Sequence, residues 1–415
     1  HQFGDHLLCA VGQMLADGCT DSAQNGHVFT RSGSSRPGLY SGCTSGSSGY
    51  MMCDAVSQVT LRPSRLTRAA ALLIALLAGA VSLRAADDLV FTLFGDYVGS
   101  LRAQAGIPGL SATIVGGKDI LWERAYGFQN VEKAVAARSD TPYQVDDLMQ
   151  TLTATMLLRC VEEGRLSLDD AVGRFAATAP DPTVNLRQLL THTSGPLANL
   201  TFTYNAERLN PLAAAVASCR GTTFRAAVVD QLQKLGMSDS VPGTDVVTVV
   251  PPADGLTDTD IARFTAVLGR LATPYAVDKS LRASVSQYKA TVLTPASGLV
   301  STLRDLAKFD LALKQGLLVR PDTLTAGWRP YVDRNDAPLP HAVGWFVQTY
   351  NGEPVVWQFG VSDGASSSLV LMLPARGLTL LLAANSDGLV KGFSLPAGDV
   401  TTSPFAKAFL GSFVR

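Results

Sequence analysis

Residues 141–164 read Thr-Pro-Tyr-Gln-Val-Asp-Asp-Leu-Met-Gln-Thr-Leu-Thr-Ala-Thr-Met-Leu-Leu-Arg-Cys-Val-Glu-Glu-Gly. Apolar residues recur in this stretch at the spacing of one helical face, which predicts an amphipathic helix over 148–163. Gly164 follows where a C-terminal cap residue ends a helix. Asp146 and Asp147 come just before the first turn, where carboxylates commonly cap a helix and are favoured by its dipole. We therefore expect these two side chains to be capping residues.

Strand patterns stand on both sides of this helix in the sequence. Upstream, 89–105 has helical spacing, and 107–124 reads as two short strands around a turn centred on Gly117. The chain is then helical and loop-rich to about residue 285, and a further helix is predicted over 303–315. The remaining apolar or alternating runs predict strands at 342–350, 355–357, 367–373 and 378–383. Strands at both ends with helices between them predict an α+β fold whose single sheet is completed by distant segments.

An apolar run occupies residues 69–83 and is preceded by Arg62, Arg65 and Arg68. As a helix it would be about 22 Å long, shorter than the roughly 30 Å hydrocarbon core of a bilayer. The pattern therefore predicts a signal peptide over 51–86, which would be a membrane anchor if it is retained. Met51 or Met52 is the expected start, and 1–50 is expected to be a flexible or spurious extension. We expect an exported protein, periplasmic or secreted, whose folded domain spans 87–415.

Charge and composition exclude several classes of protein. The 34 Lys and Arg nearly balance the 35 Asp and Glu, so no overall field attracts nucleic acid or an anionic membrane. We expect membrane contact only through the N-terminal apolar segment. After residue 87 only His192 and His341 remain, without a CxxC or HExxH motif, so we expect no metal and no cofactor.

Two cysteines, Cys160 and Cys219, lie in the predicted domain. Both fall in apolar helical patterns, and we interpret them as buried thiols. A disulfide in an oxidising compartment is the alternative.

Several motifs follow one another along the chain, namely Ile107-Pro-Gly-Leu-Ser, Tyr126-Gly-Phe, Thr141-Pro-Tyr, Leu186-Arg-Gln-Leu-Leu-Thr-His-Thr-Ser-Gly195 and Gly298-Leu-Val-Ser-Thr-Leu-Arg-Asp-Leu-Ala307. In sequence and in order they resemble the family that contains class C β-lactamases, D-Ala-D-Ala carboxypeptidases and related esterases. The resemblance covers about 90–410 and implies an antiparallel sheet flanked by helices, with an inserted helical subdomain and the active site in the cleft between them. It divides the domain into sheet parts at about 87–140 and 285–415 and a helical part at about 141–284.

The resemblance implies three catalytic motifs, and this chain departs from each of them. The Ser-x-x-Lys frame reads Asp147-Leu-Met-Gln150, so a carboxylate replaces the nucleophile and an amide replaces the lysine. The Tyr-x-Asn frame reads Tyr204-Asn-Ala206, which keeps the tyrosine and loses the substrate-orienting asparagine. The third motif, a Lys or His two residues before a Gly, reads Gln358-Phe-Gly360.

These substitutions predict that acyl-serine catalysis is lost. No neighbouring cation is expected to lower the pKa of Tyr204 from about 10, so it would be a poor general base at pH 7. If the frame is correct, Asp147 and Gln150 face the cleft, with Tyr204 and Gln358 nearby. His192 is interpreted as a partly buried, hydrogen-bonded residue of a structural turn, without a catalytic role.

Three interpretations remain open. In the first, the protein is a catalytically degenerate family member whose cleft binds a small molecule or a peptide. In the second, it is an active hydrolase, esterase or D-Ala-D-Ala peptidase in which Asp147 and Tyr204 direct water onto an ester or amide. In the third, it is the product of a decaying gene, with poor stability and no specific ligand. We adopt the first as the working hypothesis.

Overall fold

The computed structural model describes residues 89–194, 201–248, 253–333 and 335–414. The predicted extension at 1–50 and the predicted signal peptide at 51–86 lie outside the described residues. In the ranges that are described, no helix is both long enough and apolar enough to cross a membrane.

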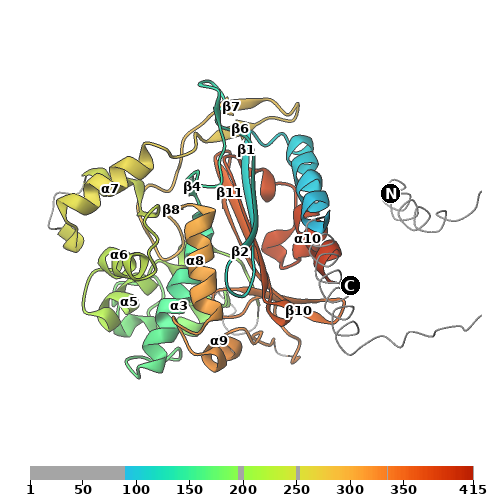
Figure 1. Cartoon of the computed structure of the whole chain (residues 1–415). Helices are drawn as coiled ribbons and strands as arrows, with labels where there is room; N and C mark the ends of the chain where they lie inside the picture. The colour runs from blue at the N-terminus through green and yellow to red at the C-terminus, as the bar shows by residue number, and fades with distance from the viewer. Residues whose placement is uncertain (1–88, 195–200, 249–252, 334, 415) are drawn as a thin grey trace, which may run out of the picture. The chain divides into compact units, whose positions relative to one another are not determined.

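A seven-stranded antiparallel sheet forms the centre of the fold, in the strand order β3-β2-β1-β12-β11-β10-β9 (Figure 1). Strand β1 pairs with β12 from Leu110 opposite Ala384 to Val115 opposite Thr379. The predicted sheet completed by distant segments is therefore confirmed. Its strands are β1 (Gly109–Val115), β2 (Ile120–Asn130), β3 (Val135–Ala136), β9 (Phe346–Tyr350), β10 (Glu353–Ser362), β11 (Ser366–Leu373) and β12 (Leu378–Ala384).

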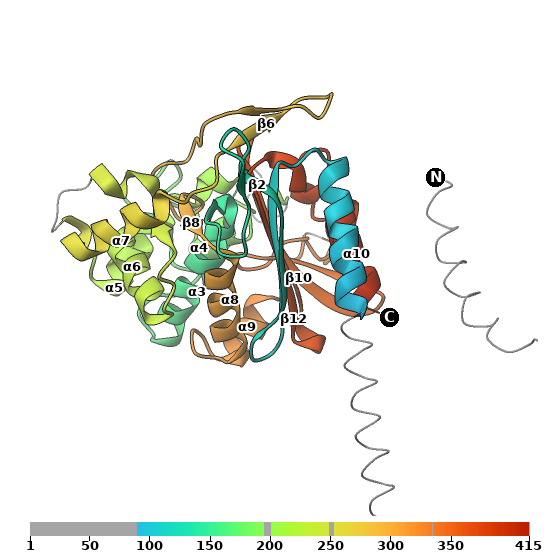
Figure 2. The same ribbon diagram turned by 45° about the horizontal axis from the view of Figure 1, so that its top comes forward.

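Both faces of the sheet are covered, which explains why its central strands are apolar runs rather than alternating ones. On one face lie the helix at 89–104 and α10 (Pro404–Phe413), and on the other lies α8 (Leu303–Lys314) (Figures 1 and 2). Neighbouring residues of β12 pack into different cores: Leu380 and Leu382 belong to the core with α10, whereas Leu381 belongs to the core with α8.

The helical part adjoins the α8 face of the sheet (Figure 1). Its central helix, α3 (Met149–Glu162), confirms the helix predicted over 148–163, and Gly164 after it has a φ of +67°. The other α-helices are α4 (Leu186–Leu190), α5 (Leu212–Arg220), α6 (Phe224–Lys234), α7 (Asp258–Leu268) and α9 (Pro321–Gly327). The small sheets contain β4 (Tyr143–Gln144), β5 (Val241–Pro242), β6 (Tyr275–Val277), β7 (Ala283–Val285) and β8 (Leu299–Ser301).

Short 3₁₀ helices fill several of the connections. Two of them border the site described below: η1 (Asp146–Leu148), directly before α3, and η3 (Ala206–Leu209). The others are η2 (Val172–Arg174), η4 (Thr244–Thr248), η5 (Ala253–Gly255), η6 (Pro374–Arg376), η7 (Asp387–Leu389), η8 (Leu395–Ala397) and η9 (Val400–Thr402).

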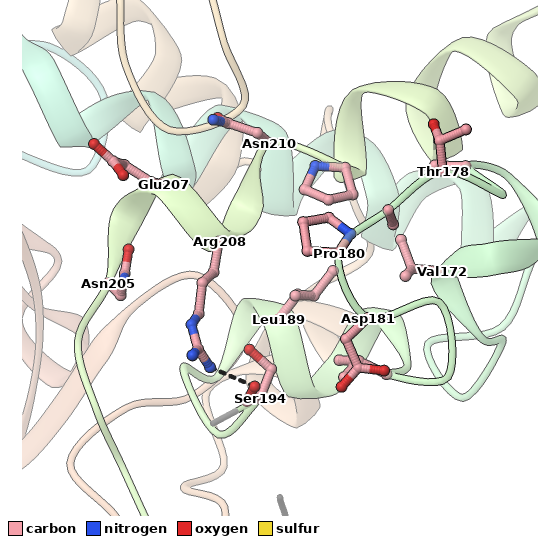
Figure 3. A pocket seen from close by; sticks show the side chains of 14 residues that line it. Val172, Thr178, Pro180, Asp181, Leu189, Ser194, Asn205, Glu207, Arg208 and Asn210 are labelled. Atoms are coloured by element: carbon pink, nitrogen blue, oxygen red, sulfur yellow. Dashed lines mark hydrogen bonds between the residues drawn. The ribbon is translucent and has the colours of Figure 1, made fainter. Parts of the chain in front are cut away.

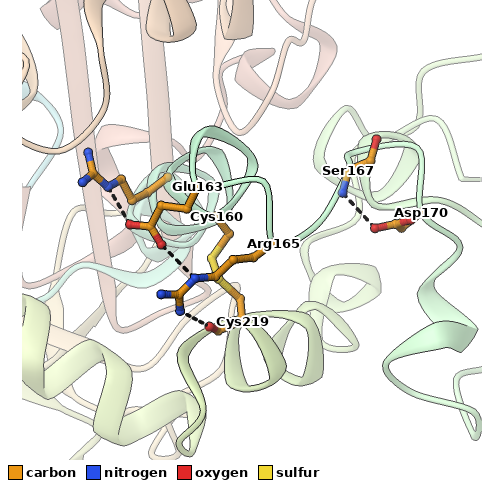
Figure 4. The surroundings of a disulfide bond; sticks show 7 residues. Cys160, Glu163, Arg165, Ser167, Asp170 and Cys219 are labelled. Atoms are coloured by element: carbon orange, nitrogen blue, oxygen red, sulfur yellow. Dashed lines mark hydrogen bonds and ion pairs between the residues drawn. A yellow bond between two sulfur atoms is a disulfide. The ribbon is translucent and has the colours of Figure 1, made fainter.

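Cys160 and Cys219 form a disulfide bond, so their interpretation as buried thiols is wrong (Figure 4). The bond joins α3 to α5, with the two Cα atoms 6.2 Å apart. Arg165 donates from Nη1 to the carbonyl oxygen of Cys219 beside it, at 2.7 Å. Apolar spacing indicated that each cysteine is buried, but only the packing of α3 on α5 brings the two sulfur atoms together.

Replacing both cysteines, as Cys160→Ala with Cys219→Ala, should lower the free energy of unfolding by about 4 kcal/mol, because the bond closes a long loop and restricts the unfolded chain. The bonded residues are 59 positions apart. Urea unfolding of oxidised protein, reduced protein and the double variant measures the effect, since reduction breaks the bond without changing side-chain size. Equal stability of oxidised and reduced protein would contradict the prediction.

Candidate functional site

The start of α3 is packed directly against strand β10. A Cβ atom placed on Gly360 of β10 would lie 2.3 Å from the carbonyl oxygen of Val145 and 2.9 Å from the backbone nitrogen of Asp147. Only glycine permits this approach, because any side chain would displace the backbone before α3. The strand therefore holds Asp147 in place from one side.

Three of the residues singled out in the sequence meet on the other side. Tyr204 donates from its hydroxyl to Oδ2 of Asp147, at 3.1 Å. Gln150 donates from Nε2 to the hydroxyl oxygen of Tyr204, at 2.9 Å. Residues three apart on a helical turn share a face, and Asp147 and Gln150 both reach the same tyrosine. They do not bond each other, and Tyr204 connects them.

The hydrogen bonds continue from Gln150 to His192. The backbone N–H of Asn205 donates to Nδ1 of His192, at 3.2 Å, so the proton of the neutral imidazole is on Nε2. Nε2 therefore donates to Oε1 of Gln150, at 3.0 Å. It follows that every bond has the same direction, from Asn205 through His192, Gln150 and Tyr204 to Asp147. We call these five residues the directed chain.

His192 is a hydrogen-bonded histidine, as expected, but it is fully buried and contacts Gln150, which the sequence analysis missed. The sequence did place His192 in a turn, and that was the available signal of its unusual position. In the structure its φ is +54°, a conformation uncommon for residues other than glycine. Its ring packs edge-on against the ring of His341, with centroids 4.6 Å apart. His341 was counted in the sequence only as a potential metal ligand.

Gln358 and Gln150 do not line the cleft. Both are completely buried, and Nε2 of Gln358 lies 3.5 Å from Nε2 of His341. Among the described residues, the histidine pair is therefore what connects Gln358 to the directed chain. The expectation that Gln150 faces the cleft is therefore wrong. An uncharged amide that is hydrogen-bonded at both ends can be buried at little cost. Gln150 meets this condition, because its amide bonds both Tyr204 and His192.

Neither aspartate caps the helix. The residue before η1 is Val145, which makes no side-chain cap hydrogen bond, and Asp147 bonds Tyr204 instead. Asp146 has a φ of +47° and accepts at Oδ2 from the Ser366 hydroxyl of β11, at 2.7 Å. The capping interpretation is wrong because both carboxylates accept hydrogen bonds from other segments. Ser366 of β11 donates its hydroxyl to Asp146, and Tyr204, before η3, donates its hydroxyl to Asp147.

Burial displaces the pKa values of the ionisable groups in the site. It raises the pKa of Asp146 to about 7, and it raises the pKa of Asp147 well above its usual range, with the charge of Asp146 adding to the effect. The pKa of Tyr204 is also raised well above its usual range by burial and by Asp147. Burial lowers the pKa of His192 to about 3. At neutral pH, Tyr204 keeps its proton and His192 is a very weak base.

A cavity of about 530 Å³ opens in front of Asp147. Ala206, at the position of the family's asparagine, lines it together with Asp146 and Asp147. A second cavity of about 730 Å³ lies in the helical part (Figure 3). Glu207 and Asn210 line both cavities, so the two adjoin along η3 and the residue that follows it.

A family model described as Beta-lactamase matches residues 94–397, so this chain belongs to the β-lactamase family. Among curated proteins, it is 32% identical over 120 residues to Protein flp of Staphylococcus aureus (strain COL), a match covering 26% of this chain and 24% of that protein. It is also 32% identical over 123 residues to Esterase EstB of Burkholderia gladioli, covering 28% and 30%. The matches thus span less than a third of those relatives.

Solved structures share the fold. The octameric penicillin-binding protein homologue from Pyrococcus abyssi superposes with a TM-score of 0.61 at 19% identity, covering 77% of this chain and 76% of that one. The D-alanine carboxypeptidase AmpC from Burkholderia cenocepacia gives a TM-score of 0.58 at 20% identity, covering 79% and 100%. These likenesses confirm the predicted fold class of an antiparallel sheet flanked by helices.

Replacing Gly360 by alanine should lower the free energy of unfolding by about 1–3 kcal/mol, because the new methyl group overlaps the Val145 carbonyl. The matched control is Gly411→Ala in α10, where nothing lies within 4 Å of the added atom. Since alanine favours a helix over glycine by about 1 kcal/mol, the control should be as stable as the parent or more stable. Urea unfolding measures the free energy of unfolding of both variants. A Gly360→Ala variant as stable as the parent would contradict the close approach of β10 to the start of α3.

Replacing Asp146 by asparagine, a mimic of the protonated acid, should remove a pH dependence of stability. Because folding raises the pKa of Asp146, the native state keeps a proton between about pH 4 and pH 7 that the unfolded state has lost. The parent should therefore lose stability relative to the variant as the pH rises, by about 1.4 kcal/mol per pH unit in that window.

The readout is the difference in free energy of unfolding between parent and Asp146→Asn, at about pH 5 and about pH 8. His192 titrates in the opposite sense, since its lowered pKa makes stability fall as the pH drops below about 6.5. Its contribution is common to both proteins and cancels in the difference. A difference that does not change with pH would show that Asp146 is ionised like an ordinary surface carboxylate.

Proposed function

We propose that this protein is an exported member of the β-lactamase family that has lost acyl-serine catalysis and uses its cleft to bind a small molecule or a peptide. The observation that carries the proposal is the directed chain, in which the groups at the family's nucleophile and base positions are hydrogen-bonded to Tyr204. The cavity in front of Asp147 supports retention of a binding site.

Acyl transfer by this family's route requires a nucleophile and a neighbouring group that accepts its proton. Asp147 has no alcohol hydroxyl, and burial raises the pKa of its carboxyl group, which disfavours the carboxylate that would act as a nucleophile. Gln150 has an amide that accepts no proton, and its amide is held between His192 and Tyr204. Tyr204 donates its own proton to Asp147 and so is not a base.

The hydrogen bonding of the directed chain argues against a decaying gene. Buried polar groups without partners are costly, and random substitutions at Asp147 and Gln150 would leave such groups behind. Here each of the two replacements is hydrogen-bonded. This order supports a site that has been kept for binding.

The alternative is an active ester or amide hydrolase in which Asp147 and Tyr204 direct a water molecule. Similarity to a segment of Esterase EstB and the contact between these two side chains favour it. It differs from our proposal in requiring a measurable hydrolysis rate that disappears in Asp147→Ala.

Export is supported by two observations on separate parts of the chain. The apolar run at 69–83 has the composition and length of a signal peptide. The Cys160–Cys219 bond is of the kind that persists in oxidising compartments.

Covalent labelling tests the loss of catalysis. The protein is exposed to a fluorophosphonate and to a fluorescent penicillin and read by intact mass, beside a restored variant with Asp147→Ser, Gln150→Lys, Ala206→Asn and Gln358→His. We expect one label on the restored variant and none on the parent. A control with Asp147→Ala and the same three other changes should also stay unlabelled. Labelling of the parent would show an active nucleophile and overturn the proposal.

A further inference from the structure

The helix at 89–104 has a second apolar face, on the side away from the sheet. Figures 1 and 2 show this helix, in cyan, at the outer edge of the described fold. Its inner face packs into the core with α10 through Phe94, Val98 and Leu101. On the outer face Leu89, Leu93 and Tyr97 are 57%, 60% and 50% exposed. These three residues recur every four positions along one side of the helix, and we call them the outer stripe. A helix that is apolar on both faces is normally covered on both.

The outer side of this helix is almost free of charge. Of the exposed residues between 89 and 104 only Asp96 is ionisable, and it forms an ion pair with Arg124 of β2, at 2.9 Å. By contrast, α8, which covers the other face of the sheet, exposes Arg304 and Lys308. The outer stripe can therefore leave water without burying an unpaired charge of its own helix.

The apolar run at 69–83 lies a short way upstream of the outer stripe. This run is predicted to be a membrane anchor if it is retained. From Leu83 to Leu89 the chain advances by six residues, which span at most about 20 Å when extended. An anchored chain would therefore hold the first turn of the helix at 89–104 close to a bilayer.

We propose that the run at 69–83 is retained as a membrane anchor and that the helix at 89–104 lies on the bilayer surface, with the outer stripe inserted among the lipids. The order of the residues fits this placement. Leu89 and Leu93 come first after the anchor, and Tyr97 follows one turn later, as a residue type that is enriched at the membrane–water interface. Because the only exposed charge of the helix is paired, the contact takes zwitterionic lipid and is insensitive to salt.

The inference goes beyond the proposed function, since no residue of the outer stripe lines either cavity. It also extends the membrane contact beyond the apolar segment expected from the sequence. A failed test would therefore leave the loss of acyl-serine catalysis untouched.

A second copy of the chain is the other surface that could cover the outer stripe. A stable dimer buries about 800 Å² on each partner, and three half-exposed side chains supply only part of that area. A bilayer needs no complementary patch, because each inserted side chain contributes by itself. The bilayer is therefore the occupant that fits the stripe better.

Tryptophan reporters test the contact with lipid. The full chain is reconstituted into phosphatidylcholine vesicles that contain brominated lipid, which quenches tryptophan fluorescence on contact. Intact mass first verifies that 69–83 is present in the membrane-bound protein, and a processed chain without this run would already overturn the proposal. Leu93→Trp should be quenched strongly relative to the parent, at low and at high salt. Leu317→Trp, at a position that follows α8 and is 68% exposed, should not be quenched. Equal quenching of the two reporters would overturn the proposal.

The depth of the bromine atoms tests the orientation of the helix. Bromine deep in the acyl chain should quench Leu93→Trp more than Tyr97→Trp, and bromine near the headgroup should reverse this order. A Leu93→Trp emission that is shifted to the blue but not quenched by either lipid would mean that a protein surface covers the stripe. That result would overturn the proposal in favour of a second copy.

A double variant tests the role of the two leucines. Leu89→Gln with Leu93→Gln should abolish the quenching of Tyr97→Trp, because the helix then has little apolar surface to insert. Val285→Gln with Leu317→Gln replaces two other exposed apolar residues and should leave the quenching unchanged. All four positions are more than half exposed, so the fold should tolerate the changes, and circular dichroism melts verify this. Loss of quenching in both double variants, or in neither, would overturn the proposal.

Discussion

The pairing of β1 with β12 is the contact on which the rest of the fold depends. It joins a strand near residue 110 to one near residue 382, so β10 and β11 lie in the same sheet as the N-terminal hairpin. Once β10 is held there, Gly360 can lie against Val145, and the start of α3 is fixed beside the sheet. The site is built at this junction, where a helix begins against the strand.

The chemistry of the junction depends on the direction of its hydrogen bonds. One backbone N–H, that of Asn205, selects the tautomer of His192, and this in turn orients the amide of Gln150 and the hydroxyl of Tyr204. Such a chain stabilises neutral groups and resists charge at any member. Asp147 is the end of the chain that lines the cavity, and Gln150 and His192 are buried behind it.

The sequence was enough to predict the sheet, the helix at 148–163 and the family, because apolar spacing and motif order are local properties. The positions of the family's motifs also identified Asp147, Gln150 and Tyr204 as site residues. It could not predict that Gln150 is buried, that Ser366 donates a hydrogen bond to Asp146, or that Cys160 and Cys219 form a disulfide. Each of these is a contact between segments distant in sequence, and residue types alone do not determine which buried faces meet.

The disulfide closes a covalent ring that contains both His192 and Tyr204, while Gln150 lies ten residues before Cys160. A ring limits how far its members can separate, so it raises their effective concentration even when the surrounding sheet is disrupted. In an oxidising compartment, the disulfide thus gives Gln150 and Tyr204 a shorter covalent connection than the chain between them, which keeps these two members of the directed chain within reach of each other. Their reassembly after a local opening becomes a short-range search.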